Sequence, residues 1–387
     1  MVNSADALVS SRSLAGPILS DLQRRMVFVG GPRQVGKTTL SLGLLGKGAT
    51  ETHPAYFNWD NAQDRTRLLK GQLPSGESLL ILDEIHKYRR WRNLVKGLYD
   101  KMKSQYRFLI TGSARLDYYR RGGDSLFGRY HYLRLHPLSL READPSCGPK
   151  TVDALLSFGG FPEPFFAADP VLHRRWLRER NERVLREDLR DLEQVKEITS
   201  LEELLGHLPS CVGSPLSVGH LKDLLNVAHQ SVERWVSIFE RLYLCFRIAP
   251  FGSKRIRAVR KERKLYFWDW SVVPDPGARF ENLVASQLLK YCHWVEDTAG
   301  HKMELRFLRD TDKREVDFVV LRDDRPEFAV ECKTGERAVS SAAAYYKERT
   351  TIPAFYQVHR GAQDFVHAST GIRVLPFETF CKELALP

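Results

Sequence analysis

The chain has 387 residues, of which 43% are hydrophobic and 28% charged, and it carries a formal net charge of +11. This length favours two or more domains, and the excess of positive charge favours an anionic partner such as nucleic acid, an anionic membrane or an acidic protein. Six scattered cysteines without a CxxC pair exclude a disulfide scaffold and a zinc site, and no apolar run approaches the roughly 20 residues that span a bilayer. We therefore expect a soluble, cytoplasmic protein without a membrane span.

The first 145 residues alternate short apolar stretches with helical intervals. The expected strands are residues 26–30, 55–60, 79–84, 107–113 and 130–137. Apolar runs of this length, separated by helices, are typical of a parallel sheet that is covered on both faces. We therefore predict an α/β domain over residues 1–145.

The first strand leads directly into the loop GPRQVGKT, which fits the pattern G-x-x-x-x-G-K-[ST] and precedes a helix. Glycines permit a tight turn, so that backbone N–H groups and the helix N-terminus can cradle phosphate. Lys37 is expected to reach the β- and γ-phosphates of ATP, and Thr38 to hold Mg²⁺. A structural glycine-rich turn is the alternative. The expected nucleotide-binding residues are Gly31, Pro32, Arg33, Gln34, Val35, Gly36, Lys37, Thr38 and Thr39.

The segment LLILDE, residues 79–84, supports the nucleotide interpretation. Its four apolar residues predict a central strand, and Asp83 then emerges at the carboxyl end, where it would bind Mg²⁺ through water. Glu84 beside it is the expected general base for the attacking water. The alternative is an acidic pair in a solvated loop.

Two further polar positions follow in the same region. The strand in RFLITGSA ends in Thr111 and Ser113, which would sense the γ-phosphate or orient water, although strands often end in small polar residues. Arg129 in SLFGR precedes the last strand. An arginine presented to a neighbouring subunit's γ-phosphate would stabilise transition-state charge, and an ordinary surface arginine is the alternative.

The middle of the chain is mostly helical. A break at 143–150 precedes a helical lid over residues 146–200, which contains an arginine-dense amphipathic stretch, 172–197, with a solvated basic face. Two helices at 218–225 and 231–242, a strand, the basic run KRIRAVRKERK (254–264) and a second strand then favour a winged helix over residues 201–275. The expected DNA-binding cations are Arg234, Arg241, Lys254, Arg255, Arg257, Arg260 and Lys261, with a solubilising surface loop as the alternative for the basic run.

A small α/β domain is expected over residues 276–387. Asp317 begins one strand, and Glu331 and Lys333 share a face of the next strand because they lie two residues apart. Asp317 and Glu331 would hold Mg²⁺ or Mn²⁺, Lys333 would activate a metal-bound water, and Glu281 would join from a helix. A chance cluster of surface charges is one alternative, and a nuclease fold that binds DNA without cutting it is another.

These fragments resemble known families. GPRQVGKTT, LLILDEIHK, ITGSA, SLFGR, PLSLRE and GGFPEP occur in an order similar to prokaryotic AAA+-superfamily ATPases with a C-terminal restriction-nuclease-like domain, over nearly the whole chain. The motif E…EVD…ECK resembles the PD-(D/E)xK core of restriction enzymes and archaeal Holliday-junction resolvases. The first resemblance implies a sensor role for Ser113, a finger role for Arg129, a winged helix and a homo-oligomeric ring such as a hexamer. It leaves the second sensor arginine unassigned.

The leading expectation is therefore an α/β chain with a P-loop AAA+-type ATPase domain, a helical lid, a winged helix and a C-terminal restriction-endonuclease-like domain. Such a chain would hydrolyse MgATP to remodel or translocate DNA, including branched DNA, and its C-terminal domain would bind or cut DNA. Two rivals remain. One is a STAND-type nucleotide-dependent signalling switch with slow turnover, but such a switch does not need an efficient base such as Glu84. The other is a small-molecule kinase, for which no acceptor pocket is recognisable.

Overall fold

The computed structural model describes residues 12–112, 126–188, 198–252, 262–336 and 338–387. The chain divides into two compact units, Met1–Leu138 and Ser139–Pro387, which we call unit 1 and unit 2. Ser113 and the run Lys254–Lys261 lie outside the described residues. No helix in the described ranges is long and apolar enough to cross a membrane.

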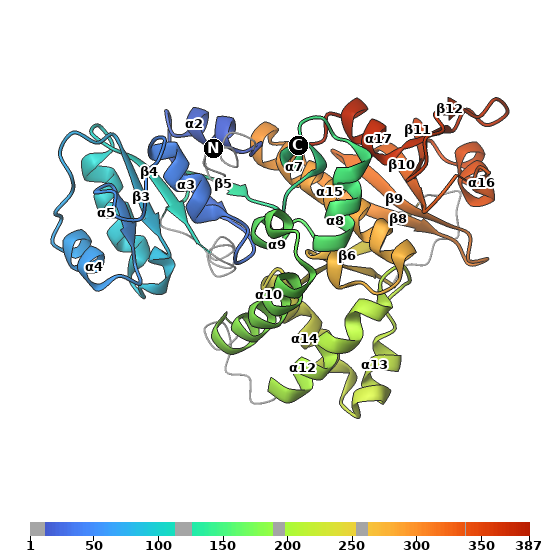
Figure 1. The fold of residues 1–387 in the computed structure, drawn as a ribbon, viewed down its shortest axis with the longest axis horizontal. Helices are drawn as coiled ribbons and strands as arrows, with labels where there is room; N and C mark the ends of the chain where they lie inside the picture. Colours follow the sequence, from blue (N-terminus) through green and yellow to red (C-terminus); the bar gives the residue numbers. More distant parts are fainter. Residues whose placement is uncertain (1–11, 113–125, 189–197, 253–261, 337) are drawn as a thin grey trace. The chain divides into compact units, whose positions relative to one another are not determined.

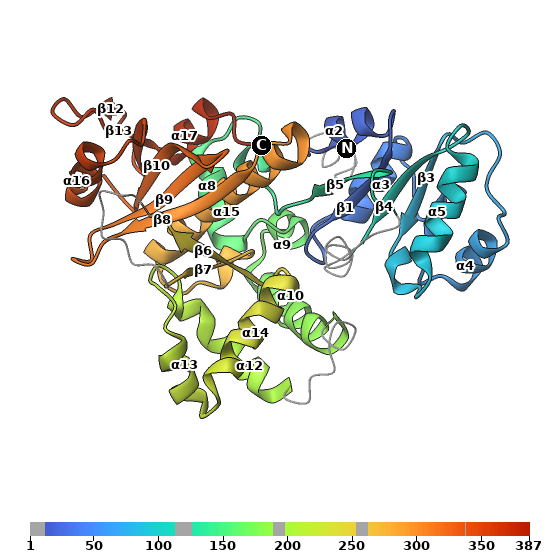
Figure 2. The same ribbon diagram turned by 180° about the vertical axis from the view of Figure 1, so that it is seen from behind.

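Unit 1 is built on a five-stranded sheet in the order β2-β3-β4-β1-β5, and every pairing in it is parallel. This confirms the predicted parallel sheet. The strands are β1 Met26–Gly30, β2 Tyr56–Asn58, β3 Leu79–Asp83, β4 Arg107–Thr111 and β5 Tyr130–Arg134. The helices are α2 Ala15–Asp21, α3 Lys37–Leu45, α4 Ala62–Leu69 and α5 Trp91–Met102, with a 3₁₀ turn η1 at Ile85–Lys87. Helices α3 and α5 flank the sheet on opposite sides (Figures 1 and 2).

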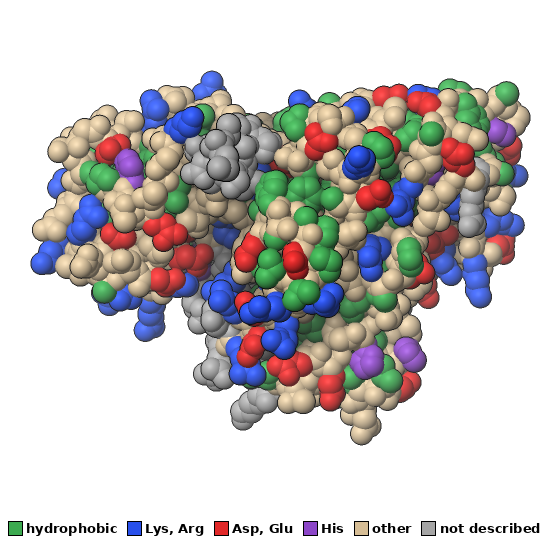
Figure 3. Space-filling view, in the orientation of Figure 1, with side chains coloured by type: hydrophobic (Ala, Val, Ile, Leu, Met, Phe, Trp, Pro, Cys, Tyr) green, Lys and Arg blue, Asp and Glu red, His purple; other side chains and the backbone are tan. Residues whose placement is uncertain are grey.

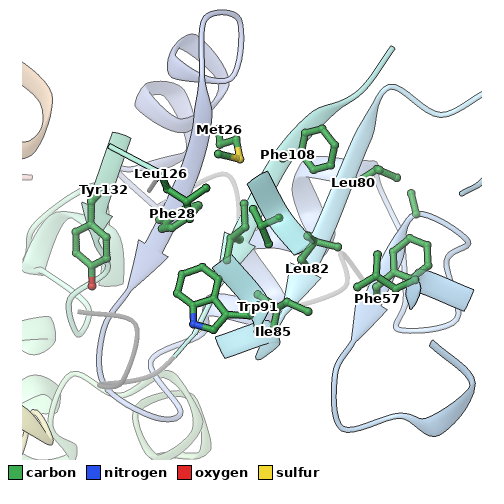
Figure 4. Close-up of a cluster of buried hydrophobic side chains, with 14 residues drawn as sticks. Met26, Phe28, Phe57, Leu80, Leu82, Ile85, Trp91, Phe108, Leu126 and Tyr132 are labelled. Atoms are coloured by element: carbon green, nitrogen blue, oxygen red, sulfur yellow. The ribbon is translucent and has the colours of Figure 1, made fainter. Parts of the chain in front are cut away.

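The core of unit 1 explains why the sequences of its strands are unbroken runs of apolar residues. Strands β1 and β3 are buried along their whole length, so both faces of the sheet need apolar side chains. Phe28, Leu82 and Phe108 project from three neighbouring strands into one cluster, which Trp91 of α5 joins (Figure 4). This packing fixes the carboxyl ends of β1 and β3 in register, where the loops that follow them meet.

Unit 2 begins with helices. They are α7 Leu140–Ala143, α8 Pro149–Phe158, α9 Pro162–Ala167, α10 Pro170–Arg183 with a π turn η3 at Val184–Asp188, α12 Ile198–His207, a 3₁₀ turn η4 at Leu208–Cys211, α13 Val218–Leu225 and α14 His229–Arg241. Helix α13 has the predicted bounds, and α14 begins two residues earlier than predicted. Asn226 ends α13 in the left-handed conformation, which asparagine tolerates, and so turns the chain into α14.

The rest of unit 2 is a mixed eight-stranded sheet in the order β12-β13-β11-β10-β9-β8-β6-β7. Its elements are β6 Cys245–Pro250, β7 Lys264–Phe267, a 3₁₀ turn η5 at Trp270–Val272, α15 Pro276–Ala299, β8 Met303–Arg309, β9 Glu315–Arg322, β10 Arg325–Lys333, α16 Ser341–Arg349, β11 Ala354–His359, β12 Phe365–Val366, β13 Arg373–Pro376 and α17 Phe377–Glu383.

The two strands expected in the winged helix belong to this same sheet. Strands β6 and β7 form an antiparallel pair, and β6 also pairs with β8, with Ala249 opposite Arg306. The segments predicted as separate domains at 201–275 and 276–387 therefore share one continuous sheet.

Candidate functional site

The nucleotide loop of unit 1 connects β1 to α3, as the sequence motif predicts. A side chain is sterically excluded at its start, because a Cβ on Gly31 would lie 2.3 Å from the carbonyl oxygen of Leu135. Gly36 has φ 97° and is the N-cap residue of α3, a conformation that favours glycine. The loop therefore presents its backbone and the N-terminus of α3 in the way that phosphate binding requires.

Two buried cations hold this loop. The Lys37 side chain is 7% exposed, and its Nζ donates to the carbonyl oxygens of Gly31 at 3.0 Å and Pro32 at 2.7 Å. The Arg12 guanidinium is buried and donates to the carbonyl oxygens of Val35 at 2.6 Å and His136 at 2.9 Å. No sequence signal identified Arg12, because it lies outside the predicted strands and the motif.

Asp83 lies at the carboxyl end of β3 and is the acceptor of three hydroxyl groups. Thr38 Oγ1 donates to its Oδ2 at 2.9 Å, Tyr56 OH donates to the same oxygen at 2.7 Å, and Thr111 Oγ1 donates to Oδ1 at 2.5 Å. The sheet produces this arrangement, since Asp83 stands opposite Thr111 on β4 in the parallel register. Burial, and then the charge of Asp83, raise the pKa of Tyr56 far above its ordinary value, so the phenol remains a donor.

The contact between Thr38 and Asp83 brings together the two residues predicted to hold Mg²⁺. A threonine hydroxyl and a carboxylate are hard oxygen donors of the kind that this ion takes, so the donor set fits MgATP. The ion would neutralise charge on the phosphates when nucleotide is bound. Of the three residues around Asp83, the sequence had identified Thr38 as a ligand and Thr111 as a polar strand end, but had missed Tyr56.

Glu84 is held in a strained conformation beside Asp83. Its φ is 56°, in the left-handed region, and its N–H donates to the carbonyl oxygen of Thr111 at 3.0 Å. Its Oε2 lies 3.5 Å from His86 Nε2 and 3.6 Å from Lys87 Nζ. Burial is the main cause that raises the pKa of Glu84 above its ordinary value, with the charge of Lys37 opposing it. A carboxylate with a raised pKa is a better proton acceptor, as a general base must be.

Arg129 lies at the other end of the sheet from the nucleotide loop. It immediately precedes β5, whose Tyr130 stands opposite Met26 at the start of β1, while the loop follows Gly30 at the end of β1. Four residue steps along a strand separate the two ends by roughly 13 Å. The guanidinium instead contacts Asp100 on α5, at 2.9 Å and 3.2 Å. The predicted finger therefore does not serve the nucleotide of its own chain.

Two of the four predicted residues of unit 2, Glu281 and Asp317, lie around a lysine that the sequence missed, and the other two, Glu331 and Lys333, pair with each other. Lys264 on β7 is fully buried, and its Nζ lies 3.0 Å from Glu281 Oε1, 2.5 Å from Glu315 Oε1 and 3.4 Å from Asp317 Oδ1. On β10, Lys333 Nζ donates to Glu331 Oε1 at 2.7 Å. We call these residues, together with Tyr266, whose hydroxyl donates to Glu281 at 2.7 Å, the Lys264 cluster.

The cluster has the electrostatics of a buried acidic site. Burial, and then the charge of Asp317, raise the pKa of Glu281 to about 7 and that of Glu331 to about 8. Burial acts to lower the pKa of Lys264, but the charges of Glu281, Asp317 and Glu315 outweigh it and raise this pKa above its ordinary value. The ammonium of Lys264 is therefore charged.

A divalent cation does not fit this arrangement. The Asp317 oxygens already accept from Lys264 and from the backbone N–H of Cys332, the latter at 2.9 Å. Within the described ranges, no group of three or more histidine, cysteine, aspartate or glutamate side chains is arranged to hold a metal ion. The ammonium of Lys264 therefore stands beside Asp317, one of the two carboxylates expected to hold Mg²⁺ or Mn²⁺.

The described part of the predicted DNA surface lies on α14. Arg234 and Arg241 are exposed and, being seven residues apart, share one face of this helix. Glu233 and Glu240 instead turn to Arg247 on β6, at 2.8 Å each. The remaining predicted contacts, Lys254, Arg255, Arg257, Arg260 and Lys261, fall outside the described residues.

Comparison with known proteins divides the chain into three matched segments. The family model AAA_14, an AAA domain, matches residues 23–143. Two domains of unknown function match the rest, DUF8612 at residues 149–274 and DUF4143 at residues 276–380. The boundary near residue 143 falls close to the division between units 1 and 2.

Similar proteins occur in bacteria and archaea. Uncharacterized protein Rv2008c of Mycobacterium tuberculosis is 28% identical over 299 residues, which cover 73% of this chain and 66% of the relative. The chain thus spans about two thirds of the length of that relative. Among solved structures, the Walker-type ATPase PABY2304 of Pyrococcus abyssi is 12% identical with a TM-score of 0.39, covering 68% of this chain and 94% of that one. The RuvB Holliday junction branch migration motor of Thermotoga maritima is 16% identical with a TM-score of 0.30, covering 60% and 87%.

The AAA match and the site geometry agree with each other. The matched segment contains the whole nucleotide loop, the Thr38–Asp83 contact and Glu84. Unit 1 is therefore a P-loop ATPase domain of the AAA type.

Proposed function

We propose that this chain is an oligomeric, Mg²⁺-dependent ATPase that uses hydrolysis to remodel or translocate DNA, which unit 2 binds. Glu84 supplies the base that activates water, and Asp83 with Thr38 holds the ion. The observation that carries the DNA assignment is a basic helical face on unit 2. Unit 2 binds DNA without cutting it, since the Lys264 cluster does not fit a metal ion.

The basic face lies on α10. Arg174, Arg175 and Arg178 are exposed, while Trp176 and Arg180 on the same helix are buried and anchor it. Arg180 is held by stacking, with its guanidinium carbon 4.3 Å from the centre of the Phe161 ring. Lys and Arg side chains gather over this helix with a few acidic groups among them (Figure 3). Such a face suits a phosphate backbone, which is recognised by charge irrespective of base sequence.

Other cations of unit 2 extend this surface in the proposal. Arg234 and Arg241 face outward on α14, the second helix of a helix–turn–helix arrangement followed by the β6–β7 pair. We assign this segment to a winged helix whose basic run, 254–261 in the sequence, tracks phosphates. The net charge of +11 agrees with a polyanionic partner.

Arg129 gives the reason for proposing an oligomer. It lies too far along the sheet to reach its own nucleotide, so a catalytic role requires the nucleotide of a second subunit. Phe127, two residues earlier, is 86% exposed, which suits a surface that another subunit covers. We propose a ring in which each Arg129 exchanges Asp100 for the γ-phosphate bound by a neighbour.

The principal alternative, a nucleotide-gated switch, needs no efficient base. Glu84, with its raised pKa beside Asp83, favours turnover over such a switch. Steady-state phosphate release with and without duplex, forked and junction DNA separates the two. The proposal expects multiple turnovers and stimulation by at least one DNA. A single stoichiometric burst that no DNA affects would favour the switch.

A charge-matched pair of variants tests where DNA binds. Changing Arg174, Arg175 and Arg178 to Gln should lower the slope of log affinity against log salt by about 3, since each phosphate contact contributes about one. The control changes three exposed cations elsewhere in unit 2, Lys302, Arg325 and Arg349, to Gln. Equal losses in both triple variants would mean that net charge, and not the α10 face, governs binding.

A further inference from the structure

Lys264 occupies an unusual position for a lysine. It is the first residue of β7 and has no exposed surface, although it directly follows a strongly basic stretch of sequence. Lysine is almost never fully buried unless it is paired. Here the pairing is extensive, because three carboxylates from two other elements, α15 and β9, lie within 3.4 Å of its Nζ.

The Glu281 and Asp317 oxygens that contact it, or lie next to it, accept hydrogen bonds from the protein itself. Glu281 Oε1 accepts from both Lys264 and Tyr266. Asp317 Oδ1 accepts from Lys264 and its Oδ2 from the backbone of Cys332. Glu331 Oε1 accepts from Lys333, whereas Glu331 Oε2 is buried without a hydrogen-bond partner. A divalent cation bound at Glu281 and Asp317 would have to displace these donors, and it would meet the positive charge of a fully buried ammonium.

The geometry also links separate parts of unit 2. Strand β7 lies at the edge of the sheet, two strands away from β8 and three from β9 in the strand order, yet Lys264 reaches Glu315 and Asp317 on β9. Its Nζ also lies 5.8 Å from the centre of the Phe307 ring on β8. Lys264 thus connects the edge strand β7 to strand β9 and to helix α15.

We propose that Lys264 is a built-in cation that takes the place of a divalent metal, so that the cluster of Glu281, Glu315 and Asp317 is a metal-independent anchor for β7. This inference does not depend on the proposed DNA role, because it concerns metal binding in the absence of DNA. Removing the Lys264 ammonium should therefore create a cation-binding site that the wild-type chain lacks.

The test is a Mn²⁺ titration of the full-length protein without nucleotide, followed by electron paramagnetic resonance of the free ion. Mn²⁺ binding by the Asp317→Asn variant is subtracted from that of the wild type, because this substitution alters the Lys264 cluster and leaves any ion bound in unit 1 unchanged. The wild-type protein should show no Mn²⁺ site that Asp317→Asn removes. Lys264→Met should gain one site with affinity at least tenfold above any wild-type binding, and the double variant Lys264→Met/Asp317→Asn should lose it.

Lys290→Met is the matched control. Lys290 is another buried lysine of unit 2 and pairs with Glu142, so its removal should uncover no Mn²⁺ site that Asp317→Asn abolishes. Circular dichroism and ATPase rate show which variants are folded. A wild-type site that Asp317→Asn abolishes would overturn the proposal, as would a folded Lys264→Met protein that gains none. If Lys264→Met does not fold, Lys264→Gln replaces it, and the wild-type titration is decisive in either case.

Discussion

The hydroxyl of Tyr56 should stabilise both unit 1 and its Mg²⁺ site, and Tyr56→Phe isolates that contribution. Tyr56 is 1% exposed, and its hydroxyl donates to Asp83 Oδ2 at 2.7 Å. Phenylalanine keeps the ring and leaves no large cavity, so the loss is confined to one hydrogen bond. A bond to a charged acceptor contributes about 1.5–3 kcal/mol. At about 2–4 °C per kcal/mol, the unfolding midpoint of unit 1 should fall by roughly 3–12 °C.

The same substitution should weaken the use of Mg²⁺ more than the binding of nucleotide. The oxygen that loses Tyr56 is the one that Thr38 also contacts, so the freed carboxylate should position the ion less well. ATPase activity measured against Mg²⁺ concentration should show a higher apparent KM for the ion, whereas nucleotide binding in EDTA should be unchanged.

Tyr106→Phe is the control for this prediction. Its hydroxyl donates to a neutral acceptor, the carbonyl oxygen of Pro74, at 2.9 Å, so its removal should cost about 0.5–1.5 kcal/mol and leave the Mg²⁺ dependence unaltered. Equal effects of the two variants on midpoint and Mg²⁺ dependence would refute the special role of the Tyr56–Asp83 bond.

Three further predictions follow from the two sites. Lys37→Ala should abolish ATP binding, whereas Glu84→Gln should bind fluorescent nucleotide and fail to release phosphate. If Glu84→Gln hydrolysed ATP at the wild-type rate, Glu84 would not be the general base. Arg129→Ala should bind ATP but hydrolyse it slowly. Mixing it with Lys37→Ala protein should partly restore phosphate release, since some subunit interfaces then combine an intact nucleotide loop with an intact Arg129. If mixtures that light scattering shows to be assembled gain no activity, Arg129 does not act across subunits. Burial raises the pKa of Glu281 to about 7 and that of Glu331 to about 8, well above the ordinary value of a glutamate, so the folded chain binds more protons than the unfolded chain between the ordinary and the raised pKa values. The stability of unit 2 should therefore fall as pH rises from about 4.5 to 8, and thermal melts of Glu331→Gln should show a smaller fall than the wild type.

The fold of unit 1 could be predicted because its local and tertiary signals agree. Buried parallel strands need apolar residues on both faces, so β1 and β3 stand out as short apolar runs. The glycine-rich loop is recognisable because its backbone geometry excludes other residues at Gly31. The partners of Asp83 were harder to find, since Tyr56 reaches it from a neighbouring strand and only the strand order places them side by side.

Lys264 marks the limit of what a one-dimensional charge pattern can predict. In the sequence it is the last residue of KRIRAVRKERK, and nothing in its immediate neighbours separates it from cations that would be expected to face water. Its burial follows from a pairing formed far along the chain. Strand β7 pairs with β6 in a sheet whose remaining strands begin about forty residues later, and α15 and β9 then supply the carboxylates. The same pattern E…EVD…ECK that predicts a metal site is therefore compatible with a buried ammonium once one more strand is added to the sheet. The acidic residues identify where a cation lies, but the identity of that cation depends on a tertiary contact that no motif within residues 276–387 contains.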